Sequence, residues 1–512
     1  MQMKESRTTK AILNAKYNLI FLIINIVIAF FSRKVFIDCL GTQFLGLSST
    51  LQSLLGFLSL AELGIGAAIG VSLYKPLADD DKNSINEIVS VLGYYYRNIG
   101  LFILIVGVII SFFLPFIFKG EEISYIVVYL TFYAFLISTL VTYFLNYRQT
   151  LLSSDQKNYV VTKYIQTANV AKLLIQMVVA YLTSNVYAWI IIELLFGFLA
   201  CIILNLRINK TYPWLVSKVS LGKEKKSKYP HIKRYTKQLF IQKVAGFTAN
   251  QISPLLIFSF VSLDMVTCAT NYTTLLSKLT MFSNSIFFST DAATGNLIAS
   301  KDKNSIVNVY KEMFSMYFFL AVFFSYMLFF LIEPFIGLWL GKQFILGKIV
   351  LLLYVINFFV CQYTGATWQF LNGYGLFKDV WASIAEMGIY LLFALLGGYL
   401  WGLEGILLAT VLSKVSIHVF WKPYFLFTQG FRVSIWIYVK MLIRHFCVYS
   451  FILLLCEPLR RMLIIEFDNW TSWIINSVVL IIVFVVIAFT ILYLTIPQFK
   501  SLFERVKFLI KF

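Results

Sequence analysis

The amino-acid sequence predicts an all-α polytopic membrane protein with about fourteen transmembrane helices. Hydrophobic residues make up 60% of the 512 residues and charged residues only 13%, against roughly 45–50% and about 25% in soluble globular domains. Uncharged apolar runs of about 18 residues or more recur along the chain, and such a run crosses a bilayer as a helix. Lysine and arginine gather in alternate loops, which is how membrane proteins fix their orientation.

The apolar runs, and the charged or turn-forming residues between them, place the spans in order. The first run follows a basic N-terminal stretch, as in a signal peptide, but it continues into Arg33 and Lys34 without a small-residue cleavage site. We therefore interpret it as an uncleaved first span. The predicted spans cover residues 15–37, 45–73, 88–117, 123–146, 159–183, 187–206, 238–260, 266–298, 309–332, 347–372, 379–399, 403–424, 435–456 and 473–496.

The basic residues predict that both termini are cytoplasmic. They are concentrated before the first span, in the C-terminal tail and in residues 207–237, where ten lysines and arginines face a single glutamate, Glu224. The simpler interpretation of this middle segment is an orientation signal and a linker between two halves. The alternative is a surface that binds acidic lipid headgroups or an anionic substrate.

A short repeat predicts that the two halves are related. The sequence Asp-Lys-Asn-Ser-Ile occurs at 81–85 and at 302–306, and Tyr96 and Tyr317 follow at the same spacing. Because six predicted spans separate the copies, both have the same membrane orientation, as in the parallel repeats of some transporters. We predict an N-terminal six-helix lobe (1–206), a basic cytoplasmic linker (207–237), a C-terminal six-helix lobe (238–425), and two further helices with a basic tail (426–512).

Catalytic and metal-binding patterns are missing from the sequence. The glycine-containing stretch 337–342 lacks the spacing and the following Ser or Thr of a phosphate-binding loop. Three histidines and six cysteines are dispersed, without a Cys-x-x-Cys pair. The sequence therefore predicts no enzyme activity, no metal and no cofactor, and the placement of its basic residues in membrane loops argues against nucleic acid as a partner.

Charged residues inside the predicted spans are the candidate functional residues. An ionisable group at the centre of a span costs about 2.5–3.5 kcal/mol against lipid, so it usually faces a protein interior or a watery cavity. A cavity with surplus cations suits an anion such as phosphate or pyrophosphate, and acids there would balance charge or bind a proton or ion. Residues near a span end have the alternative of reaching the interface. The candidate cations are Arg33, Arg97, Lys172, Lys278 and Lys414, and the candidate acids are Glu62, Glu193, Glu386 and Asp291.

Six stretches, in order along residues 12–430, resemble the Wzx-type polysaccharide-biosynthesis flippases of the superfamily that also contains the lipid II flippase and MATE exporters. Each stretch is weakly specific alone, whereas the ordered set is more specific. The stretches are RKVFIDCLGTQFLGL (33–47), LSLAELGIGAA (58–68), LLSSDQKNY (151–159), ATGNLIA (293–299), PFIGLWLG (334–341) and NGYGLFK (372–378).

This resemblance implies a flippase in the bacterial inner membrane. Its substrate would be an undecaprenyl-pyrophosphate-linked oligosaccharide, moved by alternating access of a cationic central cavity. Membrane lipids and other glycan assembly proteins would be its partners, and Arg33 and Glu62 match charged residues of the family's first two spans. The alternatives are a cation-coupled small-molecule exporter and a polytopic glycan polymerase or ligase, although the short outward loops disfavour the second.

Overall fold

The computed structural model describes residues 7–59, 65–230, 232, 236, 252–287, 294, 297–298, 302–376, 378–463 and 466–501. Within these residues every regular element is helical, which confirms the predicted all-α fold. Eleven helices in this part of the chain are long and apolar enough to cross a membrane. They correspond to eleven of the fourteen predicted spans, and the other three, at 45–73, 238–260 and 266–298, include residues outside the described ranges.

The contacts divide the chain into two compact units, Met1–Thr267 and Cys268–Phe512. Helix α11 (Leu263–Phe287) crosses the boundary. The helices of unit 1 are α1 (Arg7–Leu40), α2 (Thr42–Leu58), α3 (Ile65–Ala78), α4 (Lys82–Ile117), α5 (Tyr125–Leu145), α6 (Gln149–Ser154), α7 (Asn158–Thr183), α8 (Val186–Thr211) and α9 (Val219–Lys225).

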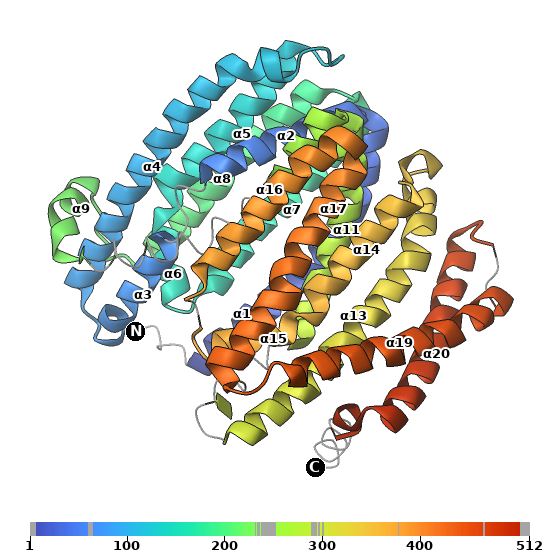
Figure 1. Ribbon diagram of the computed structural model, residues 1–512. Helices are drawn as coiled ribbons and strands as arrows, with labels where there is room; N and C mark the ends of the chain where they lie inside the picture. The colour runs from blue at the N-terminus through green and yellow to red at the C-terminus, as the bar shows by residue number, and fades with distance from the viewer. Residues whose placement is uncertain are drawn as a thin grey trace. The chain divides into compact units, whose positions relative to one another are not determined.

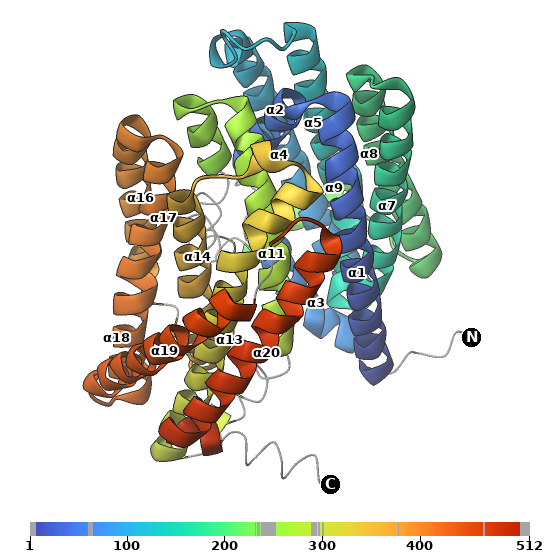
Figure 2. The ribbon, with the colours of Figure 1, turned by 90° about the vertical axis from the view of Figure 1, so that its right-hand side faces the viewer.

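In unit 1, helices that are distant in the sequence pack side by side. Helix α7 lies between α1 and α8, and α8 also packs on α5, which in turn packs on α4; Figure 2 shows α1, α7 and α8 together. Helix α1 ends at a turn in which Gly41 has φ 84°, a conformation that residues with a Cβ rarely adopt. The turn lets α2 begin one residue after α1 ends and run back over α5.

Unit 2 contains α13 (Lys303–Trp339), α14 (Lys348–Tyr363), α15 (Gly365–Gly373), α16 (Val380–Trp401), α17 (Leu403–Lys414), α18 (Lys422–Phe425), α19 (Trp436–Leu463) and α20 (Trp470–Thr495). Helices α16 and α17 lie side by side, as do α19 and α20 (Figure 1). The backbones of α16 and α17 touch at Gly397 and Gly405, the close approach that small residues permit between membrane helices.

The two units share three helix pairings. Helix α4 packs on α5, α5 on α8 and α7 on α8 in unit 1, and α13 packs on α14, α14 on α17 and α16 on α17 in unit 2. Both copies of the Asp-Lys-Asn-Ser-Ile sequence begin the first helix of this series. Asp81 accepts a hydrogen bond from the backbone N–H of Ser84, and Asp302 from those of Asn304 and Ser305. Each aspartate is therefore the N-cap of its helix. The caps fix the starts of α4 and α13 about six residues before the starts of the predicted spans.

The described part of the basic segment is packed against α4 rather than extended in solution. The backbone of Gly222 in α9 touches that of Ser90. The Glu87 carboxylate accepts hydrogen bonds from Lys228, at 2.6 Å, and from the Tyr229 hydroxyl, at 2.7 Å. These contacts belong to unit 1 alone, and the role of residues 207–237 as a linker between lobes remains a proposal.

Candidate functional site

A partly buried ion pair joins α7 to α8 in unit 1. The Lys172 ammonium lies 2.7 Å from Oε1 of Glu193, and Gln176, one turn along α7, donates a hydrogen bond of 3.1 Å to Oε2. The side chains of Lys172 and Glu193 are 18% and 15% exposed. Each ion satisfies the other, which is the arrangement that makes charges tolerable at membrane depth. Lys172 therefore contributes no surplus positive charge.

Glu193 also lines an open cavity of about 370 Å³ in unit 1. Of the lining residues that the structure describes, most of the polar ones carry hydroxyl or amide groups, and none is a cation. The lining residues are Gln52, Leu55, Gly56 and Ser59 from α2 and the residue after it, Phe135, Ser138, Thr139 and Thr142 from α5, and Glu193 from α8.

The other predicted cations of the first half and of α11 have different surroundings. Nη2 of Arg33 donates a hydrogen bond of 3.1 Å to the backbone carbonyl of Thr267. Arg97 is exposed on α4 and Lys278 is half-buried on α11. Within the described ranges neither Arg97 nor Lys278 has an ion-pair partner.

In unit 2 the predicted charged residues pair differently from those in unit 1. Nε2 of His418 lies 3.2 Å from Glu386 on α16, and the Lys414 ammonium lies 3.1 Å from the Cys361 thiol on α14. Residues four apart, such as Lys414 and His418, would share one face of a regular α-helix. A π-helix runs from Val415 to Trp421 and widens the turn between them, and the two side chains contact different helices. Such π-turns are frequent at functional sites.

A second ion pair of unit 2 was missed by the sequence analysis. Lys422 and Asp379 lie 2.7 Å apart, and both side chains are only 5% exposed. The Trp421 indole also donates to Asp379, and the Lys422 ammonium stands over the ring of Trp368 at 4.6 Å. Because both charged residues fall at predicted span ends, no sequence pattern marked them as buried.

A third cluster ties the start of α1 to the loop between α6 and α7. The Asp155 carboxylate accepts hydrogen bonds from Lys10 and from the Tyr212 hydroxyl, each at 2.7 Å, and pairs with Lys157 at 2.8 Å. Burial alone would raise the pKa of Asp155, but the bonds from Lys10, Lys157 and Tyr212 outweigh burial and lower it. Asp155 lies in one of the stretches that carry the family resemblance. Its contacts hold the start of α1 and Tyr212 against the loop between α6 and α7, which is a structural role.

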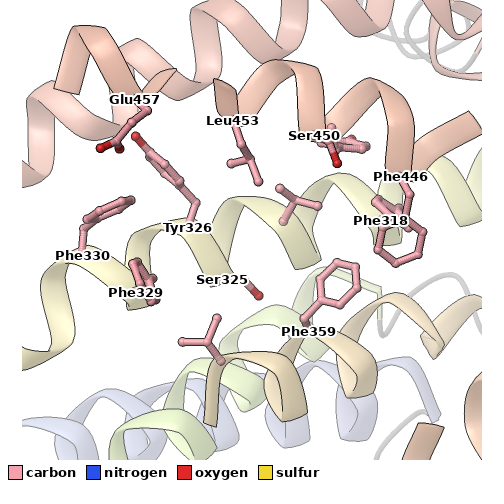
Figure 3. Close-up of a pocket in the computed structure, with 13 residues that line it drawn as sticks. Phe318, Ser325, Tyr326, Phe329, Phe330, Phe359, Phe446, Ser450, Leu453 and Glu457 are labelled. Atoms are coloured by element: carbon pink, nitrogen blue, oxygen red, sulfur yellow. The ribbon is translucent and has the colours of Figure 1, made fainter. Parts of the chain in front are cut away.

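An apolar pocket of about 320 Å³ lies between α13, α14 and α19 of unit 2. Figure 3 shows Tyr326 of α13 extending toward Glu457 of α19. The hydroxyls of Ser325, Tyr326 and Tyr449 are buried, and within the described ranges they have no hydrogen-bond partner. The lining suits an apolar ligand such as a hydrocarbon chain, and the three hydroxyls could donate to a hydrogen-bond acceptor on it. None of the charged residues predicted from the sequence lines this pocket.

Two of the predicted acids, Glu62 and Asp291, lie outside the described residues. The structure thus brings together Lys172 with Glu193, and Glu386 with His418, while Arg33, Arg97, Lys278 and Lys414 have separate surroundings. Within the described ranges, no three His, Cys, Asp or Glu side chains are grouped as metal ligands.

Comparison with known proteins identifies the fold. No protein-family model matches the sequence, and no curated protein matches it. Among solved structures, the chain is similar to the lipid II flippase MurJ in an inward closed conformation. The TM-score is 0.65 and the identity 16%, over 94% of this chain and 99% of that one.

Transporters of the MATE family have a similar fold. One inward-facing MATE multidrug transporter of the MOP superfamily matches with a TM-score of 0.52 and 13% identity, over 77% of this chain and 92% of that one. A point mutant of the Vibrio cholerae MATE transporter VcmN matches with a TM-score of 0.52 and 11% identity, over 83% and 99%. This chain is a multi-pass membrane protein with the fold that MurJ and the MATE transporters share.

Proposed function

We propose that this protein moves undecaprenyl-pyrophosphate-linked oligosaccharide repeat units from the cytoplasmic to the outer leaflet of the bacterial inner membrane, for surface polysaccharides such as O-antigen or capsule. The likeness to a lipid II flippase over 94% of the chain carries this proposal. The 6% outside that match is shorter than α19 and α20 together. The match therefore includes at least part of these two C-terminal helices.

The charged residues support an anionic, lipid-linked substrate. Arg33 offers a guanidinium that can bind pyrophosphate oxygens with two parallel hydrogen bonds, and Lys278 offers an ammonium without a carboxylate partner in the described residues. Lys172 is neutralised by Glu193, and Lys414 contacts a thiol. We assign the pyrophosphate contact to Arg33, which matches a charged residue of the family's first span, and to Lys278 and Lys414, which have no carboxylate partner in the described residues. The apolar pocket of unit 2 is compatible with a lipid substrate.

In this proposal the two six-helix lobes alternate in access to the two sides of the membrane, with both termini in the cytoplasm. Glu62, Glu386 and Asp291 would balance charge or bind a coupling proton or ion. Alternating access between related lobes is the mechanism typical of transporters built from repeats. Proteins that assemble the glycan on either side of the membrane would be its partners.

Reconstitution into liposomes tests the proposal. A fluorescent undecaprenyl-pyrophosphate-linked saccharide is placed in both leaflets, and an impermeant reductant is added outside. The protein should let the reductant reach all of the label, whereas empty liposomes lose only the outer-leaflet share. Arg33→Ala should abolish this transfer. Lys34→Ala is the matched control, because Lys34 is about half exposed and pairs with Asp38.

A cation-coupled small-molecule exporter is the second candidate, favoured by the likeness to MATE transporters. A site for cationic drugs needs free carboxylates, and Glu193 and Glu386 are both engaged, with Lys172 and His418. Loss of the gene would raise drug susceptibility if the protein is an exporter, and would deplete surface glycan if it is a flippase. A glycan polymerase or ligase would instead lengthen a radiolabelled precursor in the purified system.

A further inference from the structure

Three helices of unit 1 turn polar faces toward one groove, the cavity of about 370 Å³ that Glu193 lines. On α2, Gln52 and Gly56 are four residues apart and Ser59 follows three later, and on α5, Thr142 lies four residues after Ser138 and three after Thr139. Residues three and four apart share one face of a helix. Figure 1 shows α2, α5 and α8 close together. The polar groove is thus specified by helical periodicity within otherwise apolar spans.

The electrostatics of this groove differ from those of a phosphate site. Among its described lining residues there is no cation, and the charge of the one acid among them, Glu193, is balanced by Lys172 at 2.7 Å. A pyrophosphate entering it would meet hydroxyls, an amide and a carboxylate, and would lose its hydration without gaining a counter-charge. The groove therefore suits an uncharged ligand that hydrogen-bonds.

The groove also has hydrogen-bonding capacity that the protein leaves unused. The Gln52 amide is exposed and has no partner in the described residues, and the Ser138 hydroxyl is buried without one. Thr139 donates its hydroxyl to a carbonyl of its own helix at 2.8 Å, which leaves its oxygen free to accept. Buried polar groups are nearly always paired in folded proteins, so the unpaired Ser138 hydroxyl, with the exposed Gln52 amide lining the same groove, indicates a ligand that supplies the partners.

We propose that this groove binds sugar hydroxyls of the lipid-linked substrate, while the pyrophosphate is held by cations elsewhere in the chain. Sugars carry many hydroxyls that both donate and accept, and they have no net charge to be neutralised. A cavity of this volume falls in the range of small-molecule sites, and its open side lets a longer glycan extend outward. This inference rests on the proposed function and adds a site for one part of the substrate.

Binding of two lipid probes to the purified full chain tests the assignment. The probes are undecaprenyl pyrophosphate and the same lipid carrying one N-acetylglucosamine. The wild-type protein should bind the sugar-bearing lipid more tightly. Gln52→Leu should weaken binding of that probe about five- to tenfold, the effect of one or two lost hydrogen bonds, and leave binding of the bare lipid unchanged.

A pair of isosteric variants controls for folding and helix effects. Thr139 in the groove and Thr490 on α20 each donate a hydroxyl to the carbonyl four residues earlier, at 2.8 Å in both cases. Thr139→Val should lower affinity for the sugar-bearing probe severalfold, and Thr490→Val should not. Equal wild-type affinity for the two probes, or equal effects of the two Val variants, overturns the groove assignment. Failure of the wild-type protein to bind either probe overturns the proposed function instead.

Discussion

Removing the Lys172 ammonium should destabilise unit 1, because Glu193 would be left as an unpaired carboxylate. We choose Lys172→Met, which keeps the length of the side chain and removes only its charge. Breaking a buried ion pair on one side costs about 3–5 kcal/mol. Since both side chains are still 15–18% exposed, the lower end, about 3 kcal/mol, is expected. At about 2–4 °C per kcal/mol for domains of 150–250 residues, thermal unfolding in detergent should occur roughly 6–12 °C lower.

The double variant Lys172→Met with Glu193→Gln should recover most of this loss, because the carboxylate is then no longer charged. Lys34→Met is the matched control, since Lys34 pairs with Asp38 at 44% and 49% exposure and such pairs contribute at most about 1 kcal/mol. Two results would refute the reasoning. One is a Lys172→Met protein as stable as wild type, and the other is a double variant no more stable than the single one.

Two further predictions concern packing and pH. A Cβ on Gly405 would collide with the carbonyl oxygen of Gly397, so Gly405→Ala should lower stability by about 1–3 kcal/mol in thermal unfolding. Gly388→Ala on the same helix pair meets nothing within 4 Å and should be neutral or slightly stabilising, and equal losses in both would contradict the packing argument. The pKa of Asp155 is lowered by its partners, so its contribution is complete above the unfolded-state pKa of about 3.9 and is lost as the pH falls through the lower folded-state value. Asp155→Asn should therefore destabilise at pH 7 by about 2–3 kcal/mol, leave Lys10 without its carboxylate partner, and remove this part of the acid-induced loss in a pH series.

The fold class was predictable because the polar backbone of an apolar chain must form its hydrogen bonds internally in a bilayer, and few structures achieve this. Length and composition were enough to predict helices at each of the eleven spans that the described residues contain. Their ends were less predictable. Helices α4 and α13 extend beyond the lipid-length run because Asp81 and Asp302 cap them outside it. The pattern of apolar residues does not indicate where a helix is capped. The repeated Asp-Lys-Asn-Ser sequence does, because its aspartate is the N-cap in both copies.

The site was predictable in residue type but not in pairing. The sequence marked Lys172, Glu193, Glu386 and Lys414 as unusual for their depth, and the structure shows two of them joined to each other. Pairing depends on which helices pack together and on helix geometry at each residue. The π-helix after Lys414 changes the angular spacing that an α-helical pattern assumes. The sequence analysis considered only the formal charges in the spans, so it missed the neutral groove, although the polar residues of α2 and α5 recur at helical spacing.

These pairings change where an anionic substrate can be held. The sequence analysis predicted Lys172 and Lys414 as cations that line a cavity. In the structure the charge of Lys172 is balanced by Glu193, and Lys414 lies against the neutral thiol of Cys361. Of these two cations only Lys172 is balanced by an acid, so the cationic character proposed for the substrate site depends more on Arg33, Lys278 and Lys414. A substrate with one strongly charged segment and one polar, uncharged segment can use both the cations and the neutral groove of this chain, which a uniformly anionic one cannot. That match is a physical reason to favour a glycosylated lipid pyrophosphate over a small inorganic anion.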